Sequence, residues 1–120
     1  MLLEDSLLMK RKGVLRKKED FSKLRSMGKS AGSRYAVLVC LRNGLEYNRK
    51  AFLASKKIGN SVKRHRAARL LRESYRLIDK ERNIPSGFDF LLIAKPAISN
   101  SKCADVKKAI EAAMEKAEVL

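Results

Sequence analysis

The chain has 120 residues, 45% of them hydrophobic, which is enough for one modest core and too short for a two-domain enzyme with an interdomain cleft. Lys and Arg number 28 and Asp and Glu number 13, so the formal net charge is +15. This charge predicts a polyanionic partner, nucleic acid first and an anionic membrane surface second, because solubility alone requires much less charge.

Three N-terminal segments precede the apolar part of the chain. Residues 1–16 are basic without a clear period, and we expect a flexible arm there. Residues 17–27 are predicted to form a short helix, since Phe21 and Leu24 share a face and Gly28 is placed to end it. Residues 29–33 are expected to be a flexible basic connector, and residues 17–120 to form a single domain.

Two strands are predicted next. Residues 34–41 are apolar on both alternating faces, which is typical of a central strand. The pair Asn43-Gly44 is a strong hairpin signal, and residues 49–54 would supply the returning strand. The alternative is a longer, irregular loop around residues 46–48, because the second apolar run begins late.

The C-terminal half alternates helix and strand. A helix capped by Asn60 or Ser61 is predicted to run to about Lys80, followed by a turn over 83–87 and a buried strand over 88–94. Residues 99–101 offer caps for a last helix over about 102–118. The order α-β-β-α-β-α predicts a small α+β fold in which helices cover a sheet.

The long helix carries the clearest functional signal, because its two sides differ. One side is apolar, and the opposite side repeats basic residues at steps of four, three and four. The apolar side contains Ala67, Leu70, Leu71, Ser74, Leu77 and Ile78, with Lys63 joining in the first turn; the basic side contains His65, Arg69, Arg72 and Arg76, flanked by Arg64 and Arg66. A merely solvated face would mix signs to form i,i+4 pairs. A line of Arg side chains instead favours contact with phosphates and bases.

Other residues argue against a protein-only nuclease. The acidic residues are scattered, and a metal nuclease needs clustered carboxylates, so we expect no catalytic residue and no metal site in this chain. Cys40 and Cys103 lack CxxC spacing, which indicates reduced thiols in a cytoplasmic protein. No run reaches the ~20 apolar residues of a membrane span, and we expect no membrane partner.

The segment 55–73, SKKIGNSVKRHRAARLLRE, resembles the signature of the bacterial ribonuclease P protein component. The segments RKKEDF at 16–21 and GFDFLLIAKP at 87–96 are similar to that family's first helix and last strand. The matching residues of the signature are Ser55, Lys56, Lys57, Gly59, Asn60, Val62, Arg64, Arg66, Arg69 and Arg72. The resemblance implies the order αβββαβα, with a fourth strand and an unusual left-handed β-α-β crossover around the basic helix.

The resemblance also implies a function: the protein subunit of ribonuclease P, an endoribonuclease whose RNA, with bound Mg²⁺, frees the 5′ end of precursor tRNA. One protein would bind each catalytic RNA, without an organic cofactor. Its RNA-binding residues would be Lys56, Lys57, Asn60, Arg64, His65, Arg66, Arg69, Arg72 and Arg76. A leader-binding cleft would contain Lys17, Phe21, Arg25 and Val39. The alternative is a structural protein that binds ribosomal RNA.

The sequence departs from the family pattern at several of these positions. His65 replaces the usual Asn and Ala68 the usual Lys, and His can still donate and accept hydrogen bonds. Arg25 and Val39 occupy positions where the family has aromatic residues. These changes make stacking of the leader a weaker expectation than RNA binding by the basic helix.

Overall fold

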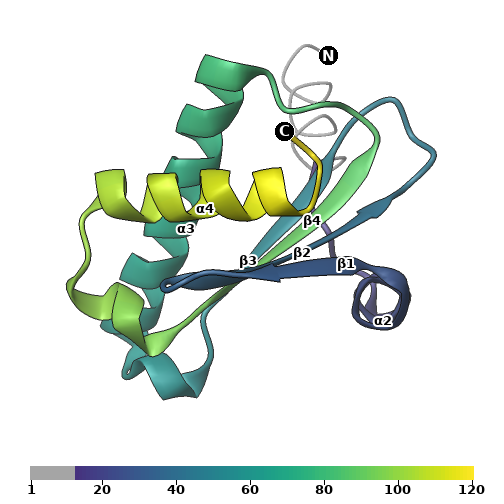
Figure 1. Ribbon diagram of the computed structural model, residues 1–120. Helices are drawn as coiled ribbons and strands as arrows, with labels where there is room; N and C mark the ends of the chain where they lie inside the picture. Colours follow the sequence, from purple (N-terminus) through teal and green to yellow (C-terminus); the bar gives the residue numbers. More distant parts are fainter. Residues whose placement is uncertain (1–12) are drawn as a thin grey trace, which may run out of the picture.

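A computed structural model describes residues 13–120, and its elements follow the order α-β-β-β-α-β-α (Figure 1). They are α2 (Lys18–Met27), β1 (Lys29–Gly32), β2 (Ala36–Arg42), β3 (Arg49–Leu53), α3 (Ser61–Arg82), β4 (Phe88–Ala94) and α4 (Cys103–Lys116), with short 3₁₀ turns at Lys56–Ile58 and Pro96–Asn100. The α+β class and the four-stranded sheet are thereby confirmed.

The four strands form one mixed sheet in the order β1-β2-β4-β3. Strand β2 runs antiparallel to both β1 and β4, and it places Leu38 opposite Leu92. Strand β3 lies parallel to β4, so α3 connects two neighbouring parallel strands. The handedness of this crossover stays a prediction.

The predicted hairpin between 34–41 and 49–54 is wrong, because β4 lies between these two strands. Asn43 and Gly44 do turn the chain: Asn43 Oδ1 accepts a hydrogen bond from Leu45 N at 2.8 Å, and Gly44 has a positive φ of 71°. The turn opens into the irregular loop that was the alternative. Long-range pairing of β2 with β4 therefore overrides the local hairpin signal.

The connector expected over 29–33 is also wrong, since Lys29–Gly32 forms the edge strand β1. Only Ala31 of this strand is buried. A four-residue polar edge strand has almost no apolar alternation, and its partner β2 supplies the pairing. This is the strand that the family resemblance implied.

Both faces of the sheet are apolar, and the helices cover one face more completely than the other. Helices α3 and α4 lie on one face over the larger core, which includes Leu71, Phe90 and Met114 (Figure 1). The short helix α2 lies on the other face, where Leu24 and Leu91 are fully buried in a smaller cluster. Both faces of β2 and β4 are apolar because both faces are covered, at least in part.

Residues 13–16 of the expected arm run beside β3. Leu15 N donates to Lys50 O at 3.1 Å, and Lys50 N donates to Gly13 O at 3.0 Å. The Leu15 side chain is buried in the smaller cluster. These four residues therefore belong to the folded body, while residues 1–12 lie outside the described residues.

The predicted cap is present at the start of α3 but not at the start of α4. Asn60 caps α3 as predicted, because its Oδ1 accepts a hydrogen bond from Lys63 N at 3.0 Å. Helix α4 begins after Lys102 without a side-chain cap. Ser101 instead donates to Ile98 O at 2.6 Å within the preceding 3₁₀ turn, so the caps predicted at 99–101 are wrong.

Candidate RNA interface

Helix α3 packs one side on the sheet and exposes the other. Its buried residues are Ala67, Leu71, Ser74, Tyr75 and Ile78. Leu70 and Leu77, which were predicted to lie on the apolar side, are only partly buried. Tyr75 was not among the residues predicted for the apolar side, but its ring packs edge-to-face against Phe52 and Phe90. Burial raises the pKa of the Tyr75 hydroxyl well above its ordinary value.

The opposite side of α3 is a basic face, by which we mean Arg64, His65, Arg66, Arg69, Arg72 and Arg76. All but the half-buried Arg64 are exposed. Within residues 13–120, Arg64, Arg66 and Arg69 form no ion pair with a carboxylate. Their positive charges are available to a partner.

Arg72 and Arg76, the last two members, have contacts within the protein. Arg76 Nε donates to Glu73 Oε2 at 3.1 Å, and this hydrogen bond holds the pKa of Glu73 below its ordinary value. The Arg72 guanidinium lies 5.7 Å from the ring centroid of Phe52 on β3. Within the described residues, only Arg76 of the basic face is paired with a carboxylate, and the ring contact of Arg72 leaves its charge in place.

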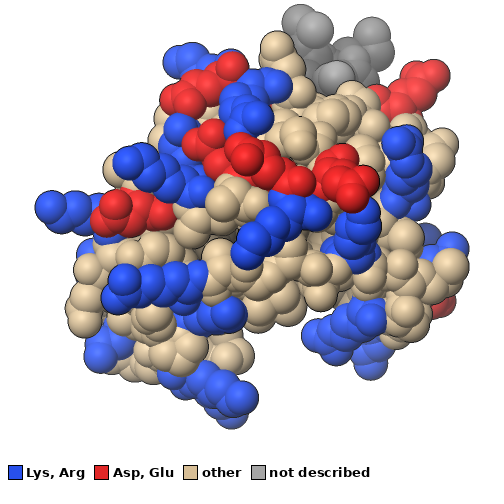
Figure 2. Space-filling model, viewed as in Figure 1, with Lys and Arg blue, Asp and Glu red and all other residues tan. Residues whose placement is uncertain are grey.

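Beyond the basic face, the C-terminal part of α3 is neutralised by α4. Arg82 Nη1 lies 2.8 Å from a Glu115 oxygen, and Lys107 Nζ lies 2.7 Å from a Glu81 oxygen and 2.8 Å from a Glu111 oxygen. In Figure 2 the acidic side chains gather over this upper region, while the lower left, where α3 begins, carries basic side chains. The electrostatic attraction for a polyanion is therefore strongest at the N-terminal half of α3.

The segment before α3 holds two exposed lysines in a fixed turn. Ser55 Oγ accepts a hydrogen bond from Lys57 N at 3.3 Å, and Ile58 is buried beneath the turn. Gly59 has φ 137° and ψ −146°, a conformation open essentially to glycine alone. This glycine-dependent turn places Lys56 and Lys57 beside the N-terminus of α3, where the helix dipole favours an anion.

The predicted leader-binding residues gather around α2. Phe21 is half-buried and packs against the smaller cluster, which contains Val39. Lys17 and Arg25 are exposed on the helix or at its start. Val39 is 8% exposed, and a Cβ added at Gly28 would come within 2.8 Å of its Cγ1. Val39 therefore packs beneath this face of the sheet and has almost no surface that a ligand could contact.

Four apolar residues that the prediction did not include lie on the same face of the sheet. They are Val37, Leu41, Leu53 and Ile93, and each is partly exposed. With Phe21 they form what we call the apolar strip. The signal was present in the sequence, because residues 34–41 and 88–94 are apolar on both alternating faces.

A part-buried ion network joins α2 to this sheet face. Arg49 donates from Nε and Nη2 to the two Asp89 oxygens at 2.8 and 2.7 Å, and Arg49 Nη1 lies 3.3 Å from an Asp20 oxygen. The hydrogen bond to Asp89 raises the pKa of Arg49. A hollow of about 180 Å³ between α2 and the sheet is lined by all three residues.

The family model described as Ribonuclease P matches residues 9–118 of the chain. The chain belongs to the ribonuclease P protein family. Among curated members, the ribonuclease P protein component of Pelotomaculum thermopropionicum is 39% identical over 111 residues, covering 92% of this chain and 97% of the relative. That of Thermoanaerobacter sp. strain X514 is 44% identical over 91 residues, covering 75% and 77%.

Solved ribonuclease P proteins share the fold. A Staphylococcus aureus RNase P protein mutant with defective mRNA degradation activity aligns with a TM-score of 0.84 and 25% identity, covering 98% of both chains. The Thermotoga maritima RNase P protein aligns with a TM-score of 0.74 and 26% identity, covering 85% of this chain and 94% of that one. Members of the family form part of an endoribonuclease holoenzyme with an RNA partner.

Two further observations concern metals and membranes. Within residues 13–120, no three His, Cys, Asp or Glu side chains lie together in a way that could hold a metal ion. In the same part of the chain, no helix combines the length and apolar character needed to cross a bilayer.

Proposed function

We propose that this ribonuclease P protein binds the catalytic RNA through the basic face of α3 and the single-stranded 5′ leader of precursor tRNA along the apolar strip. One protein serves each RNA, in the cytoplasm. The RNA holds the Mg²⁺ ions that support hydrolysis of the phosphodiester bond at the mature 5′ end. The chain contributes binding and orientation.

The uncompensated charge of Arg64, Arg66 and Arg69 is the observation that supports RNA binding most strongly. The like charges of Arg66 and Arg69, spaced i,i+3, disfavour an isolated helix, so a phosphate partner gives them a role. Lys56, Lys57 and the start of α3 extend the same positive region. Asn60 is used as the helix cap, and its amide Nδ2 can still donate to RNA.

The apolar strip supports leader binding. Single-stranded RNA is held by stacking of its bases on exposed rings and by cations that follow the backbone. Phe21 provides a partly exposed ring on this face, and cations are provided by Lys17 at the start of α2 and by Arg25 within it. Because Val39 is buried, the ring of Phe21 provides the stacking in this proposal, and the aliphatic residues of the strip provide further apolar contact for the bases.

The ion pairs formed by several acidic residues support the proposal that the RNA, not the protein, binds the metal ions. Asp20 and Asp89 pair with Arg49, and Glu111 pairs with Lys107 and Arg82. Carboxylates held in this way are poor ligands for a hydrolytic Mg²⁺ pair, which needs several oxygens converging on one point.

Reconstitution tests this function. Cleavage of precursor tRNA by the cognate catalytic RNA is measured against Mg²⁺ concentration, with and without the protein. We expect the protein to lower the Mg²⁺ requirement, because its cations replace condensed ions near the phosphates. Cleavage that is indifferent to the protein would contradict the proposal and favour a structural ribosomal RNA-binding protein. Full cleavage by the protein without RNA would contradict it as well.

A further inference from the structure

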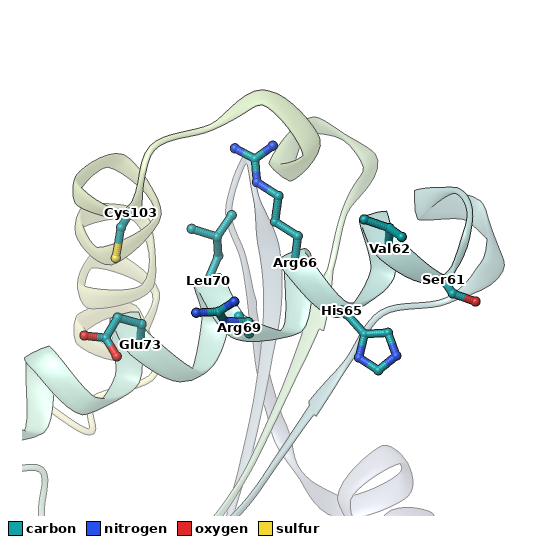
Figure 3. A pocket seen from close by; sticks show the side chains of 8 residues that line it. All are labelled: Ser61, Val62, His65, Arg66, Arg69, Leu70, Glu73 and Cys103. Atoms are coloured by element: carbon teal, nitrogen blue, oxygen red, sulfur yellow. The ribbon is translucent and has the colours of Figure 1, made fainter.

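A hollow of about 640 Å³ opens between the first half of α3 and the start of α4. It is lined by Ser61, Val62, His65, Arg66, Arg69, Leu70, Glu73 and Cys103. Figure 3 shows these side chains: most come from α3, and Cys103 comes from the first turn of α4. This volume lies within the range of sites that take small organic groups.

The hollow combines an apolar lining with a cationic rim. Val62, Leu70 and Cys103 supply apolar or weakly polar surface, and Val62 is 77% exposed although its side chain is aliphatic. Arg66 and Arg69 on the rim form no ion pair with a carboxylate within the described part of the chain, although the charge of Arg69, after that of Arg76, also helps to lower the pKa of Glu73. A phosphate alone would make no use of the apolar lining.

We propose that this hollow binds one unpaired nucleobase of the catalytic RNA. This inference rests on the proposed RNA-binding role of α3. An unstacked base has an apolar face that suits Val62 and Leu70, and guanidinium planes such as those of Arg66 and Arg69 stack on bases. The phosphates on either side of the base would meet the same two arginines. An apolar protein segment would lack the negative charge that this rim complements.

Glu73 gives the hollow a hydrogen-bond acceptor for the base edge. Its carboxylate is paired with Arg76, with Arg76 Nε 3.1 Å from Oε2, so its charge is balanced. A carboxylate has about four lone-pair sites, and a paired one still accepts from the amino group of a base. Glu73 therefore does not oppose an anionic partner.

Cys103 provides a direct test, since it lines the hollow while Cys40 is buried. The probe is N-ethylmaleimide, and the ligand is the transcribed cognate catalytic RNA. We expect bound RNA to slow alkylation of Cys103 at least tenfold. Protein alkylated at Cys103 beforehand should bind the RNA about tenfold more weakly, the scale of one lost base stack. The salt dependence should be unchanged, because the modification adds no charge.

The matched control is Cys103→Ser, which removes the thiol whose Sγ lies 3.8 Å from Ser74 Oγ and leaves a small polar side chain in its place. This variant should bind the RNA equally well before and after the same treatment, because it has no thiol at the hollow to alkylate. Catalytic RNA carrying 4-thiouridine or 6-thioguanosine should photocrosslink to Val62, Leu70 or Cys103. Crosslinks confined to other residues, or full affinity of the alkylated protein, would overturn the base site.

The outcome also separates this inference from the function on which it rests. If Arg69→Ala weakens RNA binding while the alkylated protein binds normally, the basic face stands and the base site is wrong. If neither change affects binding, the proposed role of α3 fails. Circular dichroism of the alkylated protein checks that its fold is intact.

Discussion

Arg49 holds Asp89 by two hydrogen bonds of 2.8 and 2.7 Å, and the same guanidinium reaches Asp20 on α2. Asp89 lies on the central strand β4, and its side chain is 7% exposed. Asn43 Nδ2 also donates to Asp89 at 3.0 Å. This network therefore fixes α2 and the 43–48 loop to the sheet, beside the apolar strip.

The first prediction concerns this network. Asp89→Asn should lower the free energy of unfolding by about 3 kcal/mol, because it leaves the part-buried Arg49 without its main counter-charge. Asp20→Asn is the control, and it should cost about 1 kcal/mol or less, since it breaks only the longer contact. Urea unfolding measures both. Equal losses in the two variants would contradict the ranking.

The second prediction concerns acid stability. Hydrogen bonds from Lys107 and then Arg82 hold the pKa of Glu111 below its ordinary value. Since the folded pKa is the lower one, the stabilisation is complete above the unfolded value of about 4.3 and is lost as the pH falls through the folded value. Glu111→Gln should therefore be less stable than the parent at pH 7, and the difference should shrink below about pH 4.3.

Urea unfolding at neutral pH and below pH 4 measures that difference. Glu46→Gln is the control, because Glu46 is exposed on the loop between β2 and β3. Its difference from the parent should stay small at both pH values. A difference for Glu111→Gln that is constant with pH would show that the pair with Lys107 does not stabilise the fold.

The third prediction concerns the leader. Phe21→Leu keeps an apolar side chain against Leu24 and removes the ring, so the fold should persist. Affinity of the holoenzyme for precursor tRNA should fall about tenfold, as expected for one lost stack, while affinity for mature tRNA stays constant. Equal losses for the two RNAs would remove Phe21 from leader binding and leave it a packing residue.

Local signals were sufficient for much of the fold. The cap at Asn60, the period of α3 and the apolar run of β4 depend on neighbouring residues, and each was predicted from the sequence. Strand β1 was missed although its partner β2 follows directly in the chain, because its four residues have almost no apolar alternation. The order of the strands depends on partners distant in the chain. Asn43-Gly44 signals a turn, but the residue opposite Leu38 on β4 is Leu92, far beyond that turn.

In the candidate site too, the part formed by one helix could be predicted, and the parts formed by several elements could not. The basic face could be predicted because one helix carries it. The hollow could not, since Cys103 reaches it from α4. The part-buried position of Leu70 at its edge also depends on how the two helices pack. Likewise, the burial of Val39 follows from the close approach of Gly28, which no spacing in the sequence indicates.

The most direct test of the account is the affinity of Arg69→Ala for the catalytic RNA, measured against salt concentration. Lys80→Ala, an exposed change of equal charge near the end of α3, is the matched control. We expect Arg69→Ala to weaken binding by about 1–3 kcal/mol and to reduce the salt slope by about one contact's share, with Lys80→Ala nearly unchanged. Unchanged affinity and salt slope for Arg69→Ala would contradict the claim that the basic face binds the RNA.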